Sequence, residues 1–231
     1  MRTLKPARLP DQPARKASIG VAIAATLVAG LCAAAGPGPE RVLLLYNANW
    51  TTDEDADGVQ DSLQVAQYYA AKRGVPATNL LGLACTTAYR YETTQYALFH
   101  QQVVAPITNR LAALGPESID VLLFGYATPY CLVAANGWGT ISLDTAVAVP
   151  HALDATDAGS LPVWESNPYF EPTPTFGTDL GHFDHALYRH TSGQPYYLVG
   201  RLDGPGGCGR VLSLVDQALY AERHVWPAEG H

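Results

Sequence analysis

A short acidic segment, DEDADGVQD (residues 53–61), holds the densest group of oxygen ligands in the chain. Its first three aspartates alternate with other residues, and a glycine follows the third of them. Calcium prefers a ring of hard oxygen ligands, and alternating aspartates with a glycine turn let side chains and one backbone carbonyl converge on a single ion. The segment therefore predicts a Ca²⁺ site formed by Asp53, Asp55, Asp57, the carbonyl of Val59, and Asp61.

The twelfth position of this loop is Gln64, where an EF-hand has a bidentate glutamate. The pattern is therefore closer to the short Asp-rich calcium loops of extracellular repeat proteins than to a calcium sensor. A second interpretation stays open, in which the segment is a solvated acidic loop at a helix N-terminus, favoured there by the helix dipole.

Cys208 is a candidate nucleophile because it lies at the predicted start of a helix, where a thiolate is stabilised. Such a nucleophile needs a base, and the available histidines follow the third predicted strand: His151, His182, His185 and His190. The alternative is an incidental or disulfide-bonded cysteine.

Three further polar residues fall where open α/β sheets place functional groups, at the carboxyl ends of strands: Asp144, Arg201 and Asp203. Arg201 and Asp203 could equally form a structural ion pair with each other. The segment from Gly204 to Gly209 matches the dinucleotide-binding pattern G-x-G-x-x-G, but it follows the fourth strand rather than the first, which favours a plain strand-to-helix turn.

Strands and helices alternate along the chain. Short apolar runs predict strands at residues 41–46, 79–84, 119–125 and 196–200. Amphipathic stretches predict helices at residues 61–73, 94–114, 142–149 and 211–223, the first with an Asp61–Gln64 capping box and the second kinked at Pro106. This alternation predicts an α/β fold, a three-layer sandwich with a parallel sheet of caspase-like or flavodoxin-like topology.

The first 35 residues have the order of a secretory signal peptide: basic residues, an apolar run over residues 19–35, and an Ala-Ala-Ala end. We expect residues 1–35 to be removed, leaving residues 36–231 as a single α/β domain that is secreted or periplasmic. An uncleaved membrane anchor is the alternative interpretation.

Residues 36–231 hold nine of the 14 Lys and Arg residues and 20 of the 21 Asp and Glu residues, a net charge of −11. Such a surface repels phosphate backbones, so we expect no nucleic-acid partner and no membrane insertion after signal cleavage. A cation suits it, and a protein, peptide or surface ligand remains open. Three cysteines remain after cleavage, which predicts one disulfide and one free thiol in an oxidising compartment.

Five segments together resemble a family of exported bacterial proteins to which no activity is assigned. They are SLQVAQYYAAKRGVPATNLLGL (residues 62–83), IDVLLFG (119–125), SLDTAVA (142–148), NPYF (167–170) and YYLVGRLDGP (196–205).

The LLFG strand, the YLVGRL strand and the helix ending in LYAE also resemble the first part of gingipain-type cysteine peptidases. That resemblance implies a caspase-like domain whose catalytic His-Gly and Cys lie downstream of this helix, and residues 36–231 contain no His-Gly pair. We therefore expect a sequence truncated at its C-terminus, and whether the protein is an enzyme stays open. The alternative is a non-catalytic secreted binding or surface module.

Overall fold

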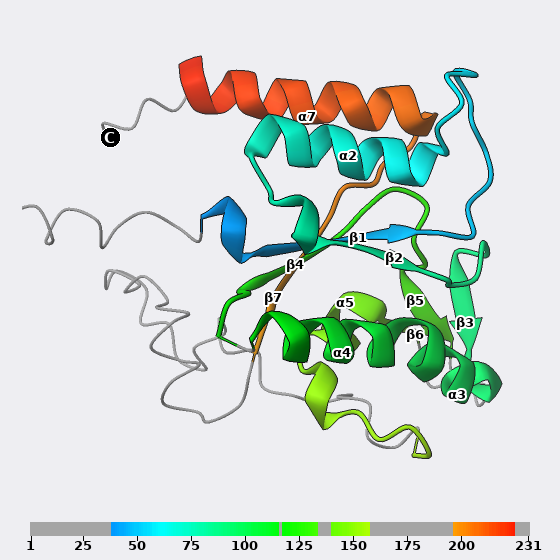
Figure 1. Ribbon diagram of the computed structural model, residues 1–231. Helices are drawn as coiled ribbons and strands as arrows, with labels where there is room; N and C mark the ends of the chain where they lie inside the picture. Colours follow the sequence, from blue (N-terminus) through cyan, green and yellow to red (C-terminus); the bar gives the residue numbers. More distant parts are fainter. Residues whose placement is uncertain (1–37, 116, 134–139, 158–195, 225–231) are drawn as a thin grey trace, which may run out of the picture. The chain divides into compact units, whose positions relative to one another are not determined.

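The computed structural model describes residues 38–115, 117–133, 140–157 and 196–224 (Figure 1). These residues belong to one compact unit, Pro37–His231. No helix within these ranges is both long and apolar enough to cross a membrane.

The main sheet has four parallel strands in the order β2-β1-β4-β7. They are β1 (Val42–Asn47), β2 (Leu80–Leu83), β4 (Val121–Phe124) and β7 (Leu198–Arg201). Numbered by their order in this sheet, they run 2-1-3-4, as the first four strands of the flavodoxin-like order do. The predicted α/β fold with a parallel sheet is confirmed.

Helices cover both faces of this sheet, so it forms the middle of three layers (Figure 1). On one face lie α2 (Asp61–Arg73) and α7 (Gly207–His224). On the other lie α3 (Tyr96–Phe99), the π-helical η4 (His100–Val104), α4 (Ala105–Leu114) and α5 (Leu143–Val147). Short 3-10 turns complete the described elements: η1 (Pro39–Arg41), η2 (Ala77–Asn79), η3 (Thr93–Gln95) and η5 (Pro150–Ala152).

Burial on both faces explains why β1 is a continuous apolar run. Leu43 and Leu45 belong to the core cluster that includes the buried residues of α4, whereas Val42 and Leu44 pack with residues of α2. Successive side chains of a strand point to opposite faces, so a strand covered by helices on both sides needs apolar residues throughout.

A second, smaller sheet was not predicted from the sequence. It consists of β3 (Arg90–Glu92), β5 (Cys131–Val133) and β6 (Thr140–Ser142). Strand β5 pairs in parallel with β3 and antiparallel with β6.

Two local predictions about helices need correction. The helix predicted for residues 94–114 contains a π-helical turn that was not predicted, η4, and Pro106 follows that turn as the second residue of α4. The capping box at Asp61 does not form, because the N-cap is Gln60 and it makes no side-chain cap bond. The C-terminal signal of the same helix is confirmed, since Gly74 ends it with φ 74°.

The predicted disulfide is absent, because Cys85, Cys131 and Cys208 are all buried free thiols. Three of the histidines proposed as bases (His182, His185 and His190) and the NPYF segment lie outside the described residues.

Candidate functional site

The loops at the carboxyl edge of the main sheet are fastened to one another by two buried polar residues. Asn47, the last residue of β1, donates from Nδ2 to the carbonyls of Thr86 and Ala127, each at 3.0 Å. Ser62 Oγ accepts the Asn47 N–H at 2.8 Å and donates to the Tyr126 carbonyl at 2.6 Å. The segments that follow β1, β2 and β4 therefore hold one another in place.

The acidic loop follows β1 at this edge and precedes α2. Asp53, Asp55 and Asp57 each offer a carboxylate oxygen, and these three oxygens all lie within 4.8 Å of one another. Backbone N–H groups inside the loop turn the side chains inward: the Gly58 N–H donates to Asp53 Oδ2 at 2.9 Å and the Val59 N–H to Asp57 Oδ1 at 2.8 Å. Three of the five predicted ligands thus converge. Val59 contacts this group through its backbone N–H, which donates to Asp57.

Gln64, at the twelfth position, faces the same carboxylates. Its Nε2 donates to Asp55 Oδ2 at 2.9 Å and to Asp57 Oδ2 at 2.7 Å. These contacts, the Gln64 hydrogen bond foremost, lower the pKa of Asp55 below its usual value. Gln64, predicted as the partner of Asp61 in a capping box, instead contacts the acidic loop from the first turn of α2.

Asp61 is fully buried and stands apart from the group of three. Its Oδ1 accepts the Glu54 N–H at 2.9 Å, so the carboxylate is turned into the loop. Its Oδ2 is buried and has no hydrogen-bond partner among the residues that the structure describes. A buried carboxylate oxygen is costly unless a cation or a donor compensates it.

Cys208 has surroundings that suit a neutral thiol. Its Sγ lies 2.9 Å from Gln64 Oε1, and burial together with nearby carboxylates, Asp61 first among them, raises its pKa to about 11. In the described part of the chain no histidine hydrogen-bonds to it, and the described candidate base, His151, packs instead against the ring of Tyr197 at 6.3 Å. The geometry therefore gives the nucleophile interpretation no support.

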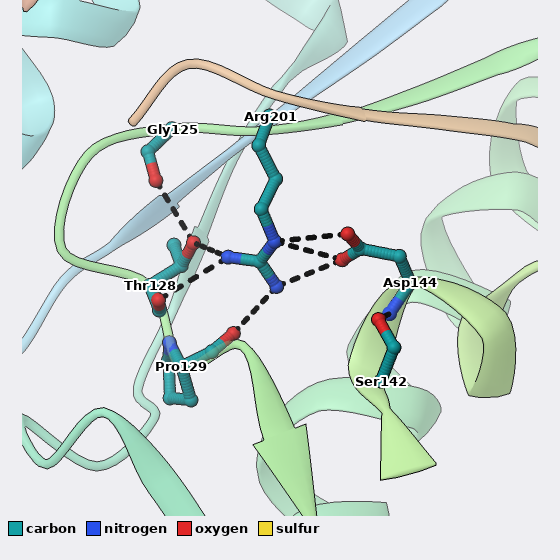
Figure 2. A network of polar contacts seen from close by, with 6 residues as sticks. All are labelled: Gly125, Thr128, Pro129, Ser142, Asp144 and Arg201. Atoms are coloured by element: carbon teal, nitrogen blue, oxygen red, sulfur yellow. Dashed lines mark hydrogen bonds and ion pairs between the residues drawn. The ribbon is translucent and has the colours of Figure 1, made fainter. Parts of the chain in front are cut away.

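Arg201, at the end of β7, is the centre of a separate polar network (Figure 2). Its guanidinium pairs with Asp144, with Nε to Oδ1 and Nη2 to Oδ1 both at 2.8 Å. It also donates to the carbonyls of Pro129 at 2.7 Å and Thr128 at 3.3 Å, and its side chain is 16% exposed. Every guanidinium nitrogen has an acceptor, so this arginine ties β7 to α5 and to the segment after β4.

The predicted alternative pairing of Arg201 with Asp203 is wrong. Asp203 Oδ1 instead accepts the N–H of Gly204 at 2.8 Å. Together with Arg201, Asp203 borders a cavity of about 280 Å³ between α2, α7 and the end of β7, which is lined by Tyr69, Arg73, Arg201, Leu202, Asp203, Val211, Leu214, Val215 and Ala218.

Two features of this edge were missed from the sequence. Glu54 Oε2 accepts the backbone N–H of Cys208 at 3.0 Å, a contact between residues too far apart for any spacing rule. Tyr89 and Tyr130 stack with ring centroids 5.4 Å apart, although their side chains are 54% and 48% exposed.

No family model matches this chain, and no significantly similar curated protein or solved structure was found.

Proposed function

We propose that this chain belongs to an exported, caspase-like α/β protein whose residues 53–61 bind Ca²⁺. The observation that carries the calcium site is the convergence of Asp53, Asp55 and Asp57, whose oxygens lie within 4.8 Å of one another. Calcium binds oxygens at about 2.3–2.6 Å, so two ligands of one ion lie at most about 5 Å apart.

The ligand set favours a weak calcium site. Three exposed or half-exposed aspartates supply the charge, and the twelfth residue is a neutral glutamine. Without a bidentate glutamate we expect a dissociation constant on the order of 10⁻⁴–10⁻³ M, which is typical of extracellular modules. An exported protein meets calcium at such concentrations.

Calorimetric titration of Ca²⁺ into the chelator-treated protein tests this proposal. We expect one bound ion per chain and a higher melting temperature, both lost in the Asp55→Asn, Asp57→Asn variant. Glu117→Gln is the control, because it removes an exposed carboxylate away from the loop. Absence of heat and of any thermal shift in the unsubstituted protein would leave residues 53–61 as an acidic helix-capping loop.

Export is proposed from residues 1–35, whose order matches a cleavable signal. Mass spectrometry of the protein recovered from the periplasm or medium should place its N-terminus at Gly36. Recovery of the intact N-terminus in the membrane fraction would contradict cleavage.

The peptidase-related part of the proposal rests on the resemblance of the strand and helix segments to gingipain-type enzymes. Since Cys208 is buried and its pKa is raised, a thiol-directed activity probe applied to the protein should not label it. Labelling of Cys208 that a Cys208→Ala substitution abolishes would contradict the assignment of Cys208 as a buried, unreactive thiol.

A second candidate function is a non-catalytic binding module, which the exposed Tyr89–Tyr130 stack favours. Aromatic rings exposed in pairs suit peptide contacts, and the backbone bond from the Tyr130 N–H to the Tyr89 carbonyl (2.9 Å) holds the pair rigidly. Screening a proline- and aromatic-rich peptide library should then give binders that Tyr130→Ala weakens at least tenfold. Tyr220→Ala, at a 64% exposed tyrosine on α7, is the control.

A further inference from the structure

We infer that Ca²⁺ bound at residues 53–61 holds the first turn of α7 in place through the side chain of Glu54. This inference rests on the calcium site proposed above and assigns that site a structural consequence elsewhere in the chain.

Glu54 joins the acidic loop to the start of α7. Its Oε2 accepts the Cys208 N–H at 3.0 Å, and its Oε1 accepts the Tyr126 hydroxyl at 3.3 Å. The first N–H groups of a helix lack intrahelical partners and carry a partial positive charge, so a carboxylate there is both an acceptor and an electrostatic partner.

The start of α7 is shaped to admit this carboxylate. Gly206 and Gly207 have φ values of 101° and 79°, which favour glycine. A Cβ on Gly207 would overlap Oε2 of Glu54, so a side chain there would displace the carboxylate. The close approach of Glu54 therefore depends on the absence of a side chain at residue 207.

The calcium ligands fix the position of Glu54. It lies between Asp53 and Asp55, two of the three converging residues, and its own N–H donates to Asp61 Oδ1 at 2.9 Å. An independent observation is that Asp61 Oδ2 is buried and has no hydrogen-bond partner in the described part of the chain, and a buried carboxylate oxygen favours a nearby cation. Without a cation, the carboxylates of this loop repel one another, and the backbone that presents Glu54 is free to move away from α7.

Gln64 also links the loop to Cys208, but it cannot carry the effect of the cation. Its Nε2 donates to Asp55 and Asp57, the carboxylates that a cation would engage, so ion binding would displace this amide hydrogen. Glu54, in contrast, keeps its carboxylate on the Cys208 N–H of α7 while the ion binds the neighbouring Asp53 and Asp55.

Hydrogen–deuterium exchange of the full chain, with Ca²⁺ or with chelator, tests the inference. We expect exchange at the amides of residues 208–210 to slow about tenfold on Ca²⁺ addition, as for the gain of one charge-assisted hydrogen bond. Amides of α4, on the opposite face of the sheet, serve as the internal reference and should change much less.

Two variants separate the coupling from the binding of the ion. Glu54→Ala should retain the calorimetric heat of Ca²⁺ binding but lose the calcium-dependent protection of residues 208–210, and Glu54→Gln, which keeps the shape, should lose most of it. Glu117→Gln should retain both. Calcium heat without added protection at α7, or equal protection at α4 and α7, would overturn this inference alone, whereas absence of heat would overturn the calcium site itself.

Discussion

Arg201 donates from all three of its guanidinium nitrogens, and a lysine cannot reproduce this geometry. Its acceptors are the Asp144 carboxylate and the carbonyls of Thr128 and Pro129. Arg201→Lys leaves at least two of these acceptors without a donor, and we expect it to lower the free energy of unfolding by about 2–4 kcal/mol. Urea denaturation of the variant measures this loss.

The matched control is Arg210→Lys, at an exposed position in the first half of α7. Surface substitutions of this kind change stability by at most about 0.5 kcal/mol. Equal stability of the two variants would show that the Arg201 network contributes no more than a surface arginine does.

Two glycines near the start of α7 should respond to alanine in opposite directions. Gly207 has φ 79°, and a Cβ there would displace Glu54, so Gly207→Ala should cost about 1–3 kcal/mol. Gly209 lies within the helix, and a Cβ there would meet no atom within 4 Å. Gly209→Ala should therefore raise stability by up to about 1 kcal/mol. Thermal unfolding of both variants checks the sign, and a shift in the same direction would contradict the prediction.

At the scale of elements, Ser62 joins α2 to both β1 and the segment after β4. It is fully buried, accepting from the Asn47 N–H and donating to the Tyr126 carbonyl. Ser62→Ala leaves these two backbone groups without a hydrogen-bond partner. We expect the free energy of unfolding, measured by urea denaturation, to fall by about 1–3 kcal/mol.

Ser213→Ala provides the comparison, because Ser213 Oγ bonds back to the Gly209 carbonyl on an exposed part of α7. Such a bond within a helix adds little, so this variant should stay within about 0.5 kcal/mol of the unsubstituted protein. Destabilisation by Ser213→Ala as large as that by Ser62→Ala would remove the case for a special role of Ser62.

The elements that could be predicted are those whose burial or end produces a recognisable pattern of neighbouring residues. Residues 42–45 of β1 are all aliphatic because helices cover both faces of the strand, and Gly74 marks the end of α2 because only a left-handed residue fits there. Strands β3, β5 and β6 have three residues each, RYE, CLV and TIS, which is too short for any periodicity to show. Their pairing comes from tertiary contacts.

At the scale of the whole molecule, the contacts of the candidate site also fall into local ones, which the sequence predicts, and long-range ones, which it does not. Asp53, Asp55 and Asp57 converge through a local loop, so their spacing alone predicted the group. The pairing of Arg201 with Asp144, and that of Glu54 with the Cys208 N–H, join segments that only the fold brings together. Sequence placed Arg201 at the end of a strand of the parallel sheet but could not say that its acceptor would be Asp144, on α5 after β6 of the small sheet.

Buried titratable groups give the whole domain a pH dependence on the alkaline side. Burial raises the pKa of Cys85 from 9.0 to about 12, and that of Tyr91 from 10.0 to about 12. Both groups are neutral in the folded state at a pH where they ionise in the unfolded chain. Their contribution to stability is therefore fully present below pH 9 and is lost as the pH rises from about 9 to about 12.

We expect the free energy of unfolding to fall by about 1.4 kcal/mol per pH unit for Cys85 above about pH 9, and by a similar slope for Tyr91 above about pH 10. Urea denaturation at pH 8, 9, 10 and 11 measures the slope, and Cys85→Ala should reduce it, because the cavity left by the thiol shifts stability by the same amount at every pH. A stability that stays constant from pH 9 to pH 11 would mean that these groups titrate alike in the folded and unfolded chains, and that water reaches the core around Cys85.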